Sequence, residues 1–136
     1  RREVDLAQVA TIGFRPFVRK YFAHRWAMFD DEGLNALRVV LSEVLVDADL
    51  RALYLDRVVL PTLALAEPLF RARVEAGEMR PLDLPLTLRA VAATFLGLIV
   101  MRLLGDEHLR HHWDAVPDLL TTMLLDGIAP PIGGAQ

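Results

Sequence analysis

The 136-residue sequence contains no cysteine, which excludes disulfide bonds, thiolate metal ligands and cysteine nucleophiles. It contains a single serine, Ser42, and neither a Gly-x-Ser-x-Gly motif nor a glycine-rich loop of the kind that holds phosphates. It also lacks the Glu-x-x-His motif on which the di-metal sites of ferritin-like bundles depend. We therefore predict no catalytic residue, no metal site and no cofactor, and we expect that the protein is not an enzyme.

The sequence also lacks the alternation of apolar and polar residues that is typical of strands, and no internal repeat is evident. Apolar residues instead recur at helical spacing. They make up 54% of the chain, which is high for one small domain. These observations predict an all-α domain with more apolar surface than its own core can bury.

No secretory leader with a charged start, an apolar stretch and a small-residue end is present, so we expect a cytoplasmic protein. Residues 1–25 carry a net charge of +4 and the remainder −7. A basic end of this kind favours either contact with a polyanion or simply a solvated helix face. The chain begins at Arg1 rather than at a methionine, and we expect it to be part of a longer protein.

The segment Leu86–Leu104 is a predicted helix without a polar face, whereas a surface helix of a small domain has one apolar and one polar side. It therefore needs burial on both sides, by its own domain and by either a membrane or a second copy of the chain. A membrane span needs about 20 apolar residues, but Arg89 and Arg102 enclose only 12. We favour a protein interface and predict no membrane partner.

The two sides of this helix differ in residue size. Ala90, Ala93 and Gly97 share one face, where the backbone of another helix can approach closely. The opposite face carries larger residues that are suited to a core, namely Val91, Phe95, Leu98 and Ile99.

Apolar periodicity predicts further helices on both sides of this segment. Their expected ranges are 14–29, 34–45, 50–57 and 61–76, followed by 114–126 at the end. We expect Pro61 to separate two helices, because a proline inside a helix frees the carbonyl four residues earlier. Gly77, Gly105 and Gly127 are predicted to stop helices, and Asp83 is predicted to cap the start of the apolar helix.

The last predicted helix, 114–126, is also apolar almost all round. Two successive helices of this kind, joined by a short polar loop, can pack against the same pair from another subunit in a two-fold four-helix bundle. The residues predicted for this dimer interface are Ala93, Gly97, Met101, Leu120, Met123 and Leu124.

Some groups could carry chemistry, but each has a simpler interpretation. His108 and His112 lie at i, i+4 beside His111 and could share a metal ion, or the segment is a solvated polar loop. Glu67 could orient a ligand, or it pairs with Arg71 one turn later. Aromatic residues at helical spacing could line a pocket or fill a core. They are Phe14, Phe17, Tyr21, Trp26, Phe70 and Phe95.

The order of segments resembles the C-terminal regulatory domain of TetR-family transcriptional repressors. The similar stretches are LNALRVVLSEVLVDADLRALYLDRVVLP, RVEAGEMRPLD, TFLGLIV and DAVPDLLTTMLLDGI. They contain a glutamate followed by acidic residues and a Val-x-x-Pro stretch, a Gly-x-x-Arg turn, and a final helix that ends in Leu-x-Asp-Gly. The resemblance covers residues 14–128.

The resemblance implies a ligand-binding and dimerisation domain at 14–128. Residues 1–13 would be the end of a linker from a missing N-terminal helix-turn-helix, and 129–136 a flexible tail. It implies a homodimer, a small apolar effector, and operator DNA bound only through the missing part. In this family the ligand changes the spacing of two recognition helices on DNA. The pocket residues expected on this basis are Phe17, Tyr21, Leu41, Leu63, Phe70 and Phe95.

The sequence thus predicts the effector-sensing part of a repressor that a small apolar ligand releases from DNA. The alternative is a freestanding helical small-molecule-binding protein or enzyme, in which Glu67 and the three histidines near residue 110 would be the working groups.

Overall fold

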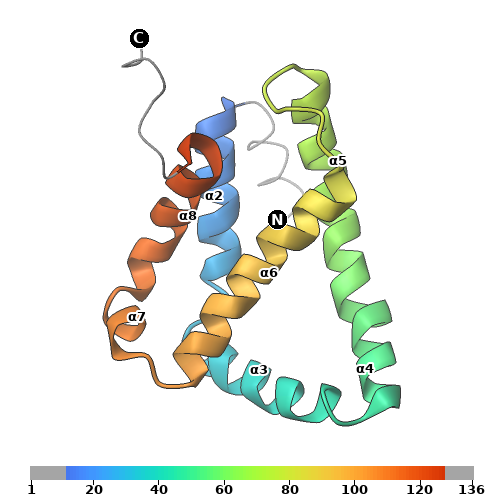
Figure 1. The fold of residues 1–136 in the computed structure, drawn as a ribbon, viewed down its shortest axis with the longest axis vertical. Helices are drawn as coiled ribbons and strands as arrows, with labels where there is room; N and C mark the ends of the chain where they lie inside the picture. The colour runs from blue at the N-terminus through green and yellow to red at the C-terminus, as the bar shows by residue number, and fades with distance from the viewer. Residues whose placement is uncertain (1–11, 128–136) are drawn as a thin grey trace. The chain divides into compact units, whose positions relative to one another are not determined.

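The computed structural model describes residues 12–127, and within that range it contains helices and no strand (Figure 1). The helices in chain order are α2 (Phe14–Trp26), α3 (Asp31–Val44), α4 (Ala48–Tyr54), the π-helical turn η1 (Leu55–Val59), α5 (Leu60–Glu75), α6 (Leu84–Leu103), α7 (Glu107–His111), the 3-10 turn η2 (Trp113–Ala115) and α8 (Val116–Asp126). The predicted all-α class is confirmed. The predicted tail 129–136 and all of the predicted linker except Ile12 and Gly13 lie outside the described residues.

The described chain divides into two compact units, and each is considered by itself. Unit 1 combines the residues up to Ala27 with those from His112 onward. Unit 2 is Met28–His111. The domain predicted for residues 14–128 therefore spans both units.

Unit 1 is built on the antiparallel pairing of α2 with α8. Arg15 near the start of α2 pairs with Asp126 at the end of α8, and Arg19 Nε donates to Asp118 Oδ1 at 2.9 Å. All four side chains are at least half exposed, so each ion pair contributes only about 0–1 kcal/mol. Burial of apolar residues stabilises the pairing more, and the buried residues of the two helices include Phe17, Val18, Phe22, Val116 and Leu120.

A pair of tryptophans closes the other end of unit 1. The Nε1 of Trp26 donates a hydrogen bond to the backbone carbonyl of Trp113 at 2.8 Å. The two ring centroids are 4.1 Å apart with an interplanar angle of 35°. Trp26 is only 4% exposed, so this hydrogen bond satisfies an indole N–H that would otherwise be buried without an acceptor.

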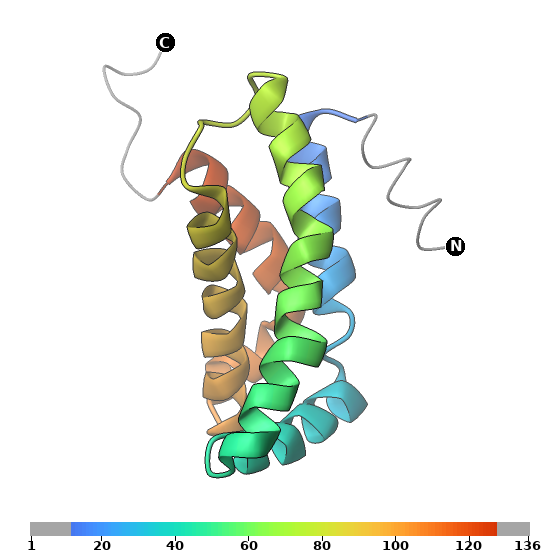
Figure 2. The same ribbon diagram turned by 90° about the vertical axis from the view of Figure 1, so that its right-hand side faces the viewer.

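In unit 2, α4, η1 and α5 form one continuous helical rod, drawn in green in Figure 2. The predicted break before Pro61 is therefore wrong. Pro61 has no backbone N–H, so the carbonyl of Arg57 loses the donor that an α-helix would supply. The backbone widens by one residue instead of breaking, and the N–H of Leu60 donates to the carbonyl of Leu55.

The second half of this rod packs on α6, which follows it in the chain. The turn between them is fixed at both ends as predicted. Gly77 takes a φ of 78°, and the N–H of Glu78 donates to the carbonyl of Arg73 at 3.0 Å, which closes a Schellman motif. Asp83 accepts a hydrogen bond from the N–H of Leu86 at 3.0 Å and caps α6. The predicted stops at Gly105 and Gly127 also hold, with α6 ending at Leu103 and α8 at Asp126.

Helix α3 begins with a tight turn over residues 28–33. Asp30 caps the helix by accepting a hydrogen bond from the N–H of Gly33 at 2.8 Å. A Cβ on Gly33 would lie 2.0 Å from the carbonyl oxygen of Met28, so this position has no room for a side chain. The other end of the unit returns to this turn, because Arg102 of α6 pairs with Asp31 at 3.4 Å.

We expect Gly33→Ala to lower the free energy of unfolding by about 1–3 kcal/mol, because the added methyl group forces the backbone apart. Urea denaturation followed by circular dichroism measures the change. Ser42→Ala on the same helix is the control. Ser42 is exposed and bonds only to its own helix, so the change there is within about 0.5 kcal/mol. Equal stability of Gly33→Ala and the parent chain would contradict the tight turn.

We expect Trp26→Phe to lower the free energy of unfolding by about 1–3 kcal/mol, because it leaves the carbonyl of Trp113 without its donor. It also removes the coupled near-ultraviolet circular dichroism signal of the two adjacent indoles. Trp113→Phe is the matched control, since it removes the same signal but keeps the backbone acceptor. A parent chain with no coupled signal would refute the close indole pair.

Candidate functional site

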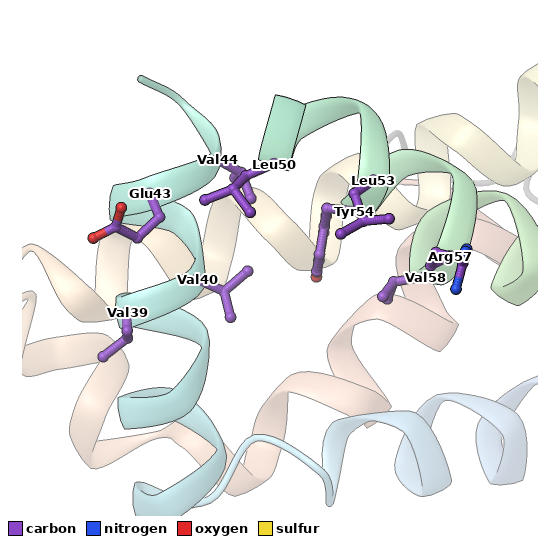
Figure 3. A pocket seen from close by; sticks show the side chains of 9 residues that line it. All are labelled: Val39, Val40, Glu43, Val44, Leu50, Leu53, Tyr54, Arg57 and Val58. Atoms are coloured by element: carbon purple, nitrogen blue, oxygen red, sulfur yellow. The ribbon is translucent and has the colours of Figure 1, made fainter. Parts of the chain in front are cut away.

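A cavity lies in unit 2 between α3 and the first half of the helical rod, which comprises α4 and η1 (Figure 3). Its volume is about 480 Å³, which falls in the range of small-molecule sites, about 300–1,000 Å³. Most of its lining is aliphatic, and the cavity is broadly open to solvent, since Val39, Leu53 and Val58 are 62%, 50% and 43% exposed. The lining residues are Val39, Val40, Glu43, Val44, Leu50, Leu53, Tyr54, Arg57 and Val58.

Helical spacing places these side chains on two facing surfaces. On the rod they run from Leu50 in α4 to Val58 in η1 and form the wall that faces α3. On α3 they occupy the last turns before Val44, where the helix ends. Asp47 then caps α4 by accepting hydrogen bonds from the N–H groups of Asp49 and Leu50. This short connection holds the two surfaces next to each other.

Three polar side chains interrupt the apolar lining. Tyr54 is half-buried, whereas Glu43 and Arg57 are exposed. Figure 3 shows Glu43 and Arg57 on opposite sides of the group, with Tyr54 between them. Within residues 12–127 no ion pair or side-chain hydrogen bond engages Arg57. The cavity therefore offers an uncompensated guanidinium beside apolar walls.

None of the six residues predicted for the pocket lines this cavity. Phe17 and Phe70 are buried in the two units, at 0% and 4% exposure. Tyr21 is half-buried in unit 1, where burial raises the pKa of its phenol and the charge of Arg25 lowers it less. The remaining three, Leu41, Leu63 and Phe95, are half-buried in unit 2. Leu41 lies between lining residues of α3 but is not one of them.

The lining residues that the sequence prediction missed were recognisable only in part. Tyr54, Arg57 and Val58 have the i, i+3, i+4 spacing of one helical face, so a mixed apolar and polar surface was visible there. The expected break before Pro61 obscured this surface, because a helix predicted to span only residues 50–57 was too short to be treated as one wall of a pocket. That α3 faces it is a tertiary fact that no local pattern contains.

The predicted division of α6 into two faces agrees with the structure. Leu84, Leu88 and Ile99 are buried, and Phe95 is half-buried on the same side. The opposite side is exposed along its whole length. It includes the predicted interface residues Ala93, Gly97 and Met101, together with Leu86, Ala90, Leu96, Val100 and Leu104. We call this surface the α6 outer face.

Helix α8 of unit 1 presents a smaller apolar surface. Met123 and Leu124, both predicted for the interface, are 43% exposed, and Leu119 is 56% exposed. Leu120 differs from the prediction, since it is 8% exposed and lies on the buried side of α8. The sequence could not separate it from its neighbours, because α8 is apolar on almost every side.

Among the described residues, α6 is the helix long and apolar enough to cross a membrane by length and composition. Only 17% of its most apolar window is buried within the chain. The α6 outer face is therefore left uncovered within the described chain.

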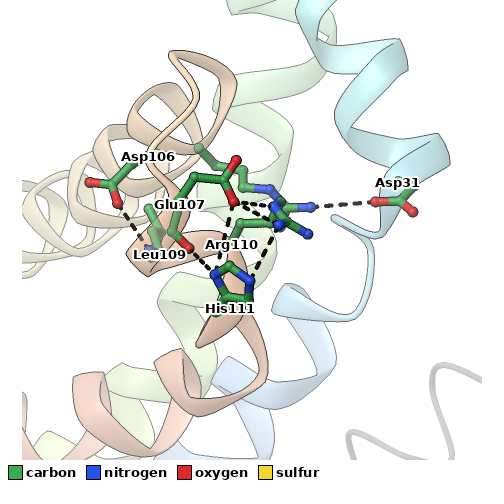
Figure 4. A network of polar contacts seen from close by, with 7 residues as sticks. Asp31, Asp106, Glu107, Leu109, Arg110 and His111 are labelled. Atoms are coloured by element: carbon green, nitrogen blue, oxygen red, sulfur yellow. Dashed lines mark hydrogen bonds and ion pairs between the residues drawn. The ribbon is translucent and has the colours of Figure 1, made fainter.

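The histidine-rich segment forms polar contacts within itself (Figure 4). Arg110 holds the carboxylate of Glu107 at 2.6 Å, and Nδ1 of His111 lies 2.7 Å from the backbone carbonyl of Glu107. The described residues contain no group of three or more histidines and acids that could hold a metal ion. The pairing of Glu67 with Arg71 is also present, at 2.6 Å. These groups fit the interpretation as solvated structure.

We expect Glu107 to titrate below its ordinary pKa, because the hydrogen bond and the charge of Arg110 favour its carboxylate. The folded-state pKa is lower than the unfolded one, so the contribution to stability is present at neutral pH and lost as the pH falls through that lowered value. An NMR titration of the carboxyl group measures this. Arg110→Ala returns the pKa toward its ordinary value, whereas Arg71→Ala leaves it unchanged. An ordinary pKa in the parent chain contradicts the pairing.

Comparison with protein-family models, with curated proteins and with solved structures gives no match for this chain. The TetR-like membership inferred from the sequence therefore stays a prediction. The cavity, the exposed apolar faces and their charges are the features of this chain that bear on its function.

Proposed function

We propose that the chain is the effector-binding and dimerisation domain of a TetR-like transcriptional regulator, a cytoplasmic repressor that a small ligand releases from DNA. DNA would be read only by a helix-turn-helix encoded before Arg1. The observation that carries the proposal is an exposed glycine, Gly97, in the middle of the long apolar helix α6.

Nothing within residues 12–127 explains this glycine. Glycine inside a helix costs about 0.5–1 kcal/mol relative to alanine, and a Cβ at Gly97 would meet no atom within 4 Å. Its φ is not in the left-handed region, unlike that of Gly77. A partner helix that approaches the backbone closely at this point supplies the missing reason.

A second copy of the chain is the partner that suits the α6 outer face. The face is apolar except for Arg89, which lies one turn before Ala93 and is the one charged side chain that is exposed on the described helix. Large exposed apolar patches mark interaction sites. A two-fold axis through Gly97 would bring identical faces together without placing like charges in contact at the centre. A TetR-like bundle would also use the exposed apolar residues of α8.

The cavity in unit 2 supports the effector part of the proposal. It has the size and apolar lining of a small-molecule site, and it lies on elements other than α6. A ligand there would act by binding more tightly to one dimer arrangement than to another. The reciprocal effect is that dimerisation changes the affinity for the ligand.

We expect the parent chain to sediment as a dimer at micromolar concentration, and Gly97→Leu to raise the dimer dissociation constant at least about tenfold, equivalent to about 1.4 kcal/mol. The leucine would block the close approach of the helices. Analytical ultracentrifugation measures both. Ala52→Leu is the matched control, because it adds a leucine at an exposed position of another helix, α4, away from the α6 outer face.

A parent chain that is monomeric at this concentration would contradict the dimer. Flotation of the parent chain with neutral liposomes would show that the chain binds membranes, and it would contradict the assignment of the α6 outer face to a dimer interface. A dimer that Gly97→Leu leaves intact would place the interface elsewhere.

A freestanding small-molecule-binding protein is the second candidate, and the cavity also supports it. The DNA sequence upstream of the Arg1 codon separates the two candidates. A helix-turn-helix encoded there supports the regulator, and its absence favours the freestanding protein.

A further inference from the structure

We propose that the cavity between α3 and the α4–η1 rod binds an aliphatic carboxylate, with the carboxylate group at Arg57 and Tyr54 and the tail against the valines and leucines. The inference rests on the proposed function, because it gives the effector of that function a chemical class. Its test measures ligand binding and dimerisation separately, so that either can fail alone.

The apolar walls define the tail of the ligand. Val40 and Val44 lie on α3, and Leu50 and Leu53 lie on the facing rod. These side chains have no polar atom, so they cannot form a hydrogen bond with a hydroxylated or charged ligand body. Only an apolar chain or ring recovers the free energy of removing their surface from water.

The polar end of the cavity favours an anion. Tyr54 ends α4 and Arg57 lies in the adjoining turn η1, and both side chains line the cavity. Arg57 presents a fork of N–H donors that matches a carboxylate, and the phenol of Tyr54 adds an O–H donor. Because no side chain in the described part of the chain engages Arg57, a ligand would not have to displace one.

Glu43 determines the orientation of the ligand. It lines the cavity from α3 and lies on the other side of the group from Arg57 (Figure 3). A carboxylate near Glu43 would meet a like charge, whereas one at Arg57 meets an opposite charge and the Tyr54 hydroxyl. The ligand would therefore enter with its anionic end toward η1 and its tail toward the end of α3.

Three probes of equal tail length test the chemistry: decanoate, decanol and decyltrimethylammonium, each below its micelle concentration. Isothermal titration calorimetry on the parent chain measures their affinities. We expect decanoate to bind at least about tenfold more tightly than decanol, and the cation to bind most weakly. Equal affinities would reduce the site to a nonselective apolar groove and overturn the proposal. Tighter binding of the cation would assign the polar end to Glu43 and overturn it as well.

Variants then test the named groups. Arg57→Ala is expected to weaken decanoate binding about tenfold while leaving decanol unchanged, and Arg57→Gln is a second variant of the same position. Tyr54→Phe keeps the ring and loses the hydroxyl, with an expected loss of roughly threefold to tenfold. Arg71→Ala is the matched control. It removes the same charge from an exposed position on the same rod outside the cavity lining, and it leaves decanoate binding unchanged.

Sedimentation of the same samples separates this inference from the proposed function. A dimeric parent chain without a preference for decanoate overturns the carboxylate site and leaves the dimer standing. A monomeric parent chain that prefers decanoate, with the preference lost in Arg57→Ala, supports the site and overturns the proposed dimer. Circular dichroism of Arg57→Ala and Arg57→Gln confirms that both fold, which is expected because Arg57 is exposed.

Discussion

The constraint on which the proposals depend is that α6 has no side suited to water. One side, which carries Leu84, Leu88 and Ile99, is buried inside unit 2, while the other side is left exposed in the single chain. Leu86, Leu96 and Val100 on that side are 64%, 44% and 39% exposed, so complete burial of each would add on the order of 1 kcal/mol. The single chain therefore leaves a large apolar surface uncovered, and this makes association of some kind the first physical expectation for it.

Electrostatics has a more limited role, and unit 1 shows where it acts. Two residues of the basic N-terminal end, Arg15 and Arg19, are paired with acids of α8. Exposed pairs of this kind add little stability. They connect the start of α2 with the end of α8, while the Trp26–Trp113 hydrogen bond connects the opposite ends of unit 1.

Local signals predicted the ends of most helices because caps and stops are chemical properties of single residues. Asp83, Gly77 and Gly127 act within one turn of where they stand, so their roles follow from sequence. Periodicity also assigned Phe95 and Ala93 to opposite sides of α6 correctly. It failed for Leu120, since an apolar helix has no polar side to mark the outside, and for the cavity, since residues such as Val40 and Arg57 line the same cavity only through tertiary packing. The proline at position 61 gave a wrong prediction because a helix can widen as well as break.

The widened turn at η1 determines an angle in unit 2. Successive residues of an α-helix are rotated by about 100°, and a π-helical turn holds one residue more than an α-helical turn. Every residue after Val59 is therefore rotated, relative to Leu50 and Tyr54, away from where an uninterrupted α-helix would place it. The extra residue in η1 thus sets the angle around the rod between the cavity wall on α4 and the side of α5 that buries Phe70. Deleting Asp56, which does not line the cavity, would rotate Arg57, Val58 and all of α5 around the rod relative to Tyr54 and so divide the cavity wall between two directions.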